Sequence, residues 1–206
     1  MEEKIKELTD KIAKLSEKME FIYFDVSWMF DDPNSDSARY ERERRENQAK
    51  IKQEYNELNK QLDILYRIDF AMKNRPVTSN EILDLYVEGR DTFTQACQYN
   101  LFKHNTNEYV GNIRYIGECE GMFGNISYEI EEAHRGNHYA LIGLELVGID
   151  LSKRGVEELF ISAEKWNKAS IKTIEKFGGK LIDDEGGLVQ YKCDIKNREM
   201  FKGGRK

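Results

Sequence analysis

The first third of the chain carries apolar residues at alternating intervals of three and four positions. This spacing runs from Ile5 to Met29 and resumes from Ile51 to Leu65. A heptad pattern of this kind places apolar side chains along one seam of an α-helix, as in a coiled coil. The first seam consists of Ile5, Leu8, Ile12, Leu15, Met19, Ile22, Val26 and Met29, and the second of Ile51, Tyr55, Leu58, Leu62 and Leu65. Because Pro33 and neighbouring turn formers separate them, the pattern predicts a helical hairpin over residues 1–70.

The far end of the first predicted helix is rich in aromatic residues. It contains Phe21, Phe24, Trp28 and Phe30. In an antiparallel hairpin these side chains would face residues 38–48, which are nearly all charged. Two partners stay open, namely the chain's own second half and a second copy that pairs through the N-terminal helices. The sequence is therefore compatible with a homo-oligomer but does not require one.

The heptad pattern ends before residue 90, and shorter apolar runs follow. Residues 74–80 form a predicted linker, and Thr78 or Ser79 would cap a helix over residues 80–89. Runs rich in Tyr, Phe, Ile and Val predict strands at 92–102, 109–117, 122–130, 159–163, 180–183 and 188–195. Helices are predicted from 136 to about 153 and from 167 to 177, where Asn167 is the N-cap and Gly178 with Gly179 ends the helix. Residues 71–206 are thus predicted to form an α+β domain.

Composition removes several classes of function. The net charge of −6 and the interleaving of basic with acidic residues argue against a nucleic-acid partner. The longest apolar run is too short to span a bilayer, and the chain begins with a charged segment, so we expect a cytoplasmic protein without a membrane partner. Cys97, Cys119 and Cys193 lack C-x-x-C spacing, which argues against disulfides and a zinc site. We therefore expect no metal.

Three segments carry the most specific pattern, and they occur in a fixed order. They are "GNISYEIEEAHRGNHYA" from residue 124, "KRGVEELFISA" from residue 153 and "NKASIKTIEKFGGK" from residue 167. Together they resemble the core motifs of the GNAT superfamily of N-acetyltransferases over residues 90–195. The resemblance implies a mixed, mostly antiparallel sheet flanked by helices. It also implies transfer of an acetyl group from acetyl-CoA, as co-substrate, to a small-molecule or peptide amine.

The loop 135–140 resembles the family's phosphate-binding R-x-x-G-x-A motif. Arg135 and Ala140 match, whereas His138 replaces the glycine. A side chain there would crowd the phosphate or strain the loop, or its amide would still donate while the imidazole pairs with phosphate. We expect retained binding, because main-chain amides at a helix N-terminus do most of the work. The coenzyme-binding residues implied by the resemblance are Ile130, Arg135, Gly136, Asn137, His138, Tyr139, Ala140, Asn167, Ser170, Ile174 and Lys176.

Catalysis by such a domain needs a base and an oxyanion donor. Glu129 and Glu120 are the candidate bases, since partial burial makes a carboxylate a better base at neutral pH. The resemblance places the oxyanion donor at a backbone amide near Glu129 and Ile130.

The leaving thiolate of coenzyme A also needs a proton. The family's usual tyrosine acid is replaced by Ile174, which the resemblance places beside the sulfur. Tyr128, Tyr139 or water would have to substitute. Ile174, His138 and the N-terminal helices leave open an alternative class, a non-catalytic acyl-CoA-binding or interaction module.

Overall fold

The chain folds into two compact units, Met1–Phe70 and Ala71–Lys206. The computed structural model describes residues 1–20, 36–91, 96–117 and 124–196.

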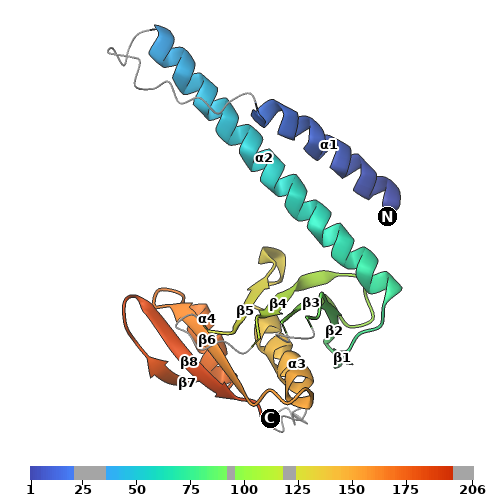
Figure 1. Cartoon of the computed structure of the whole chain (residues 1–206), viewed down its shortest axis with the longest axis vertical. Helices are drawn as coiled ribbons and strands as arrows, with labels where there is room; N and C mark the ends of the chain where they lie inside the picture. Colours follow the sequence, from blue (N-terminus) through green and yellow to red (C-terminus); the bar gives the residue numbers. More distant parts are fainter. Residues whose placement is uncertain (21–35, 92–95, 118–123, 197–206) are drawn as a thin grey trace. The chain divides into compact units, whose positions relative to one another are not determined.

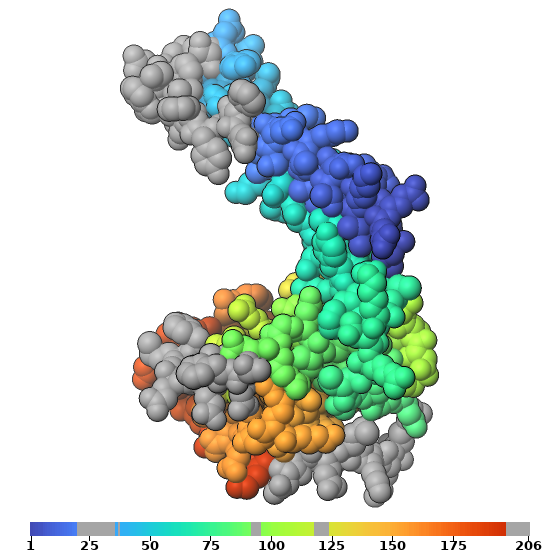
Figure 2. All heavy atoms as spheres, turned by 45° about the vertical axis from the view of Figure 1, so that its right-hand side comes forward, coloured from blue at the N-terminus to red at the C-terminus, as the bar shows by residue number. Residues whose placement is uncertain are grey.

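The first unit contains α1 (Glu2–Glu20) and all but the last three residues of α2 (Asp36–Lys73). Both views show α1 lying beside α2 (Figures 1 and 2). Leu8 and Leu15 are buried, and the other described positions of the two predicted seams are half-buried. Both predicted helices are therefore present, with their apolar seams among the less exposed positions. The rest of the first seam (Ile22, Val26 and Met29), the aromatic residues of segment 21–30 and Pro33 lie outside the described residues.

The second unit contains two antiparallel sheets (Figure 1). The first has the order β1-β2-β3-β4-β5 and comprises β1 (Thr78–Ser79), β2 (Leu83–Glu88), β3 (Cys97–Lys103), β4 (Tyr109–Tyr115) and β5 (Ile126–Ile130). The second has the order β6-β8-β7 and comprises β6 (Glu158–Glu164), β7 (Lys180–Asp183) and β8 (Leu188–Asp194). Two helices, α3 (Tyr139–Lys153) and α4 (Lys168–Lys176), connect these strands. The predicted α+β class with mostly antiparallel pairing is confirmed, although the strands form two sheets.

The prediction of a helix over residues 80–89 is wrong, because this segment contains strand β2. Leu83 and Leu85 are fully buried, and their alternation belongs to a strand that pairs with β3. The Asn80 side chain accepts hydrogen bonds from the amides of Ile82 and Leu83, at 2.8 Å each. This asparagine turn starts a strand, whereas Thr78 and Ser79, the predicted caps, form β1.

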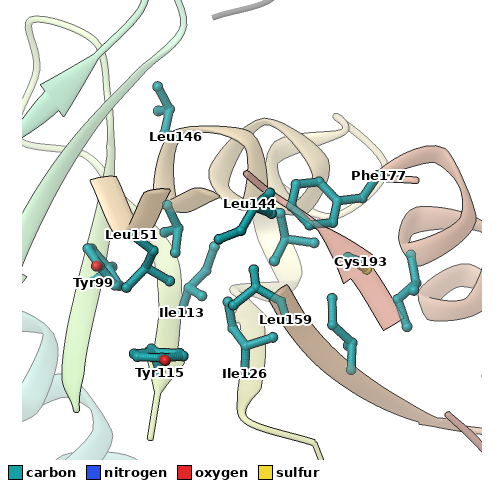
Figure 3. Close-up of a cluster of buried hydrophobic side chains, with 14 of the residues drawn as sticks. Tyr99, Ile113, Tyr115, Ile126, Leu144, Leu146, Leu151, Leu159, Phe177 and Cys193 are labelled. Carbon is teal, nitrogen blue, oxygen red and sulfur yellow. The ribbon is translucent and has the colours of Figure 1, made fainter. Parts of the chain in front are cut away.

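The core of the second unit is formed mainly by α3 and the two sheets. Leu144 and Leu151 of α3 join Ile113 of β4 and Leu159 of β6 in one buried cluster (Figure 3). Gly143 permits this close packing, because a Cβ there would lie 2.8 Å from Leu101 Cδ1. The first sheet and α3 thus form a closely packed support for the segment between β5 and α3.

The two sheets are joined at the start of β5. Gly124 forms an isolated bridge with Ile161, and a Cβ on Gly124 would lie only 2.5 Å from Phe160 O. The Asn125 amide donates to Phe160 O at 2.8 Å, while the Phe160 amide donates to Asn125 Oδ1 at 2.9 Å. Beyond this join β5 pairs with β4 and β6 pairs with β8. Among the described strands, β5 therefore ends its sheet with one edge unpaired.

Candidate functional site

A cavity of about 690 Å³ lies beside β5, the segment that follows it, the N-terminal part of α3 and one face of α4. These elements come from two distant parts of the sequence. The lining residues are Tyr128, Glu129, Ile130, His134, Arg135, Gly136, His138, Tyr139, Ala140, Leu141, Trp166, Asn167, Ala169, Ser170, Lys172, Thr173 and Lys176.

The loop before α3 leaves the amides at the start of this helix available for a ligand. His138 is the N-cap and has φ 60°, in the left-handed region. Its side chain makes no capping hydrogen bond, and the first turn contains no acidic residue. The Ile142 amide donates to His138 O, so the helical hydrogen bonds begin there. The helix consequently starts at Tyr139, three residues later than predicted, with its positive end at the cavity wall.

The charged residues that line the cavity favour an anion. Among the described lining residues Arg135, Lys172 and Lys176 are cationic, whereas Glu129 is the one acidic residue. Arg135 also has a structural contact, because its Nε donates to Ile130 O at 3.1 Å. A helix N-terminus combined with fixed cations is a suitable environment for phosphate groups.

Helix α4 begins as the sequence predicts. The Asn167 side chain accepts a hydrogen bond from the Ser170 amide at 3.1 Å, which confirms Asn167 as the N-cap. At the other end Gly178 has φ 100°, and the amide of Gly179 donates to Ile174 O at 2.9 Å. The predicted glycine stop is therefore also confirmed.

Strand β5 directs two backbone amides toward its unpaired edge. The Glu131 amide donates to Val110 O and the Ile116 amide donates to Asn125 O. Because ladder bonds alternate along an antiparallel pair, the amides of Tyr128 and Ile130 point away from β4. The predicted oxyanion donor near Glu129 and Ile130 therefore corresponds best to the Ile130 amide or that of Tyr128.

The Tyr128 side chain crosses from β5 to α4. Its hydroxyl lies 2.7 Å from Ser170 Oγ, and either oxygen can be the donor. Burial raises the pKa of Tyr128, and hydrogen bonds with the side chains of Ser170 and Thr173 offset this only in part. The phenol is therefore protonated at neutral pH.

Most of the sequence-predicted site residues meet at this cavity. They are Glu129, Ile130, Arg135, Gly136, His138, Tyr139, Ala140, Asn167, Ser170 and Lys176. Asn137 is not among the described lining residues, because its side chain donates to His134 O and Arg135 O within the loop. The other predicted base, Glu120, lies outside the described residues.

Two predictions about site residues need correction. Ile174 is fully buried in the hydrophobic core, so it does not line the cavity. Glu129 is exposed, because Tyr128 and Ile130 occupy the inward positions of β5 and the side chain between them points outward. The partial burial that made Glu129 an attractive base is therefore absent.

Several lining residues were missed at the sequence level. They are His134, Leu141, Trp166, Ala169, Lys172 and Thr173. Thr173 and Lys176 follow Ser170 at successive intervals of three along α4, which is the signal that would have identified this face. Trp166, with 76% of its surface exposed, has no comparable sequence signal.

The described residues were also compared with the expectations for a metal site, a membrane-spanning helix and disulfides. Across the described ranges no three His, Cys, Asp or Glu side chains are grouped so as to hold a metal ion. None of the helices described is long and apolar enough to cross a membrane. Cys97 and Cys193 are buried and form no disulfide, while Cys119 lies outside the described residues.

We expect the substitution His138→Gly to stabilise the second unit. A left-handed backbone costs a non-glycine residue about 1–2 kcal/mol of folding free energy, which glycine avoids. Glycine also makes the unfolded chain more flexible, and this lowers stability by about 0.4–1 kcal/mol. The net gain, about 0.5 kcal/mol, would appear as a higher denaturant midpoint. Asn105→Gly, at φ 57°, is the control. It should gain less, because asparagine tolerates this region better. A loss of stability in His138→Gly would show that the imidazole makes a stabilising contact.

Among known proteins, this chain is similar only to solved structures, and the similarity is one of structure. No protein-family model matches the chain, and no curated protein matches it. Among solved structures, the GNAT domain of S. lividans PAT aligns with 17% identity and a TM-score of 0.43, over 50% of this chain and 63% of that one. RimL, a ribosomal L7/L12 α-N-protein acetyltransferase in complex with coenzyme A, aligns with 19% identity and a TM-score of 0.41, over 48% of this chain and 62% of that one.

A GNAT-family acetyltransferase from Streptococcus pneumoniae aligns with 13% identity and a TM-score of 0.42, over 52% of this chain and 70% of that one. The chain thus spans less than two thirds of the S. lividans and RimL chains. Two of these three structures are named as GNAT proteins and RimL as an acetyltransferase, and at identities below 20% the likeness concerns the fold alone.

Proposed function

We propose that this chain binds acetyl-CoA in the cavity beside β5 and transfers the acetyl group to an amine. The observation that carries the proposal is the uncapped N-terminus of α3 opening into a cavity whose wall contains Arg135, Lys172 and Lys176. A pyrophosphate is the kind of ligand that such a site favours. The motif resemblance over residues 135–140 agrees with this assignment.

Each end of the proposed site has its own task. The amides of Tyr139 and Ala140, with Lys176 and Arg135, would hold phosphate oxygens. The amide of Ile130 or Tyr128 would donate to the thioester oxygen as it gains negative charge during attack. Glu129 would take the ammonium proton of the acceptor through water, a role that its exposed position on the wall permits.

The proposal assigns different roles to the two parts of the chain. Residues 71–206 would carry the transferase, and the helices of residues 1–70 would serve oligomerisation or substrate docking. The acceptor class stays broad, a small-molecule or peptide amine, because acceptor pockets depend on variable loops. A cytoplasmic location is part of the proposal, since Cys97 and Cys193 are buried and form no disulfide, which suits a reducing compartment.

We expect acetyl-CoA to raise the thermal midpoint of the full chain. A ligand that binds only the folded state adds about 2.7 kcal/mol at a concentration of 100 Kd. In calorimetric titrations Lys176→Ala should weaken binding roughly tenfold, because a charge-assisted hydrogen bond to phosphate is lost. Lys153→Ala is the matched control, since this exposed lysine lies in the last turn of α3, at the opposite end from the cavity.

Two outcomes would oppose the proposal at different levels. An unchanged midpoint at saturating acetyl-CoA would remove coenzyme binding altogether. Binding without turnover across a panel of polyamine, aminoglycoside, small-metabolite and peptide N-terminal acceptors would instead favour the non-catalytic acyl-CoA-binding module.

A further inference from the structure

Three hydroxyl groups from two elements meet on the cavity wall. Tyr128 belongs to β5, whereas Ser170 and Thr173 lie one turn apart on α4. The contact between Tyr128 Oη and Ser170 Oγ, at 2.7 Å, joins residues 42 positions apart in the sequence. The phenol is thus held between strand and helix, and all three residues line the proposed coenzyme site.

This cluster supplies what α4 lacks. Ile174 is fully buried and has no proton to donate, so α4 offers no acid at that position. Tyr139 also lines the cavity, but its ring packs edge-on against His134, with 6.2 Å between ring centroids, in the anion-binding part of the wall. Tyr128 lies instead on the strand whose unpaired amides would hold the thioester oxygen. It is the better placed of the two phenols for the reacting end of the substrate.

We propose that Tyr128, oriented by Ser170, donates its hydroxyl proton to the leaving sulfur of coenzyme A. The inference rests on the acetyl transfer proposed above. As the acceptor nitrogen bonds to the acetyl carbon, the carbon–sulfur bond breaks and its electron pair stays on sulfur. The Tyr128 proton moves to that sulfur and gives the free thiol. The proton lost by the acceptor nitrogen returns to the phenolate through water, so the enzyme is unchanged after each cycle.

The hydrogen bonds around Tyr128 suit this role. Since either oxygen of the Tyr128–Ser170 pair can donate, Ser170 can donate to the Tyr128 oxygen both before and after transfer, which leaves the single phenol proton for the sulfur. A phenol is a weaker acid than a thiol, so the main benefit is a hydrogen bond to sulfur as negative charge develops. Ser170 is accordingly a positioning residue in this scheme, and Tyr128 is the catalytic one.

The first test is Tyr128→Phe in the full chain, with acetyl-CoA and an amine that the wild type acetylates. We expect kcat to fall about 10- to 100-fold, the usual cost of one hydrogen bond to a charged group, while the KM for acetyl-CoA stays within a factor of about three. Tyr191→Phe is the matched control, because Tyr191 is also buried and its hydroxyl bonds to Glu175 away from the described lining residues. Its kcat should match the wild type.

The second test measures binding and needs no turnover. Calorimetric affinities for coenzyme A and for desulfo-coenzyme A, which lacks the thiol, are compared at pH 7 and pH 9.5. In the wild type the preference for coenzyme A should rise about tenfold as the thiol, of pKa about 8.5, ionises. In Tyr128→Phe this rise should be absent, and in Tyr191→Phe it should persist.

The outcomes separate the two proposals. A wild type that binds neither ligand overturns both the coenzyme site and the role of Tyr128. A wild type that binds and acetylates, together with a Tyr128→Phe variant of equal kcat and equal pH-dependent preference, overturns only the assignment of Tyr128 as sulfur donor.

Discussion

The substitution Ile174→Tyr is expected to destabilise the second unit by about 3 kcal/mol or more. Ile174 has no exposed surface and packs so closely on Gly179 that a Cβ there would lie 2.6 Å from Ile174 Cγ2. A tyrosine ring is too large for this space, and its hydroxyl would be buried among apolar groups without a hydrogen-bond partner provided for it. Because folded domains are stable by only about 5–15 kcal/mol, this is a large loss.

Two companion variants on α4 make this measurement specific. Ile174→Val removes one methylene and should cost about 1 kcal/mol. Lys172→Tyr places the same ring on an exposed position and should change stability by less than about 0.5 kcal/mol. Denaturant unfolding followed by circular dichroism gives all three values. If Ile174→Tyr were as stable as Lys172→Tyr, the assignment of Ile174 to the core would be wrong.

This error at Ile174 shows how helical phase limits prediction from sequence. Seven residues separate Asn167 from Ile174, which suggests that they share one helical face. Asn167, however, is the N-cap with φ −81° and ψ 69°, so it does not lie on the helical track of α4. The cavity face follows Ser170 and Thr173 instead. Ile174, one residue further along, is rotated by about 100° toward the core.

The elements themselves were easier to predict than their faces. The strands after residue 95 and the caps of α4 follow from local signals, namely apolar runs, an asparagine N-cap and a glycine stop. The helix prediction for residues 80–89 was wrong because a short apolar run bounded by polar residues is compatible with either a helix or a strand. Pairing with β3 stabilises the strand conformation of β2, and this long-range contact cannot be inferred from the local sequence.

The candidate site was predictable where a loop motif fixes it. Arg135, Gly136 and His138 line the cavity, and the left-handed backbone of His138 corresponds to the glycine that the motif has there. The outward position of Glu129 could also have been inferred from alternation along its strand. The contact between Tyr128 and Ser170 could not, since it depends on how β5 and α4 meet in space.

The substitution Gly111→Ala is expected to cost roughly 3 kcal/mol and to abolish measurable acetyl-CoA binding. Gly111 lies on β4 opposite Ile130, at a position where antiparallel strands approach most closely. A Cβ there would lie 2.2 Å from Glu129 O and 2.9 Å from Ile130 Cα, both backbone atoms that cannot rotate away. The end of β5 must therefore shift, and it carries the Ile130 amide and the carbonyl that accepts from Arg135.

The control for Gly111→Ala is Gly155→Ala, where no atom lies within 4 Å of the added Cβ and the cost comes from φ 89° alone. That variant should lose about 1–2 kcal/mol and keep its coenzyme affinity, because Gly155 lies beyond the C-terminal end of α3, far along the helix from its N-terminus at the cavity. Unfolding midpoints and calorimetric titration with acetyl-CoA distinguish the two. If Gly111→Ala lost the expected stability but still bound acetyl-CoA normally, β5 would be able to shift without disturbing the site. The contact between β4 and β5 would then not determine the position of the proposed oxyanion donor.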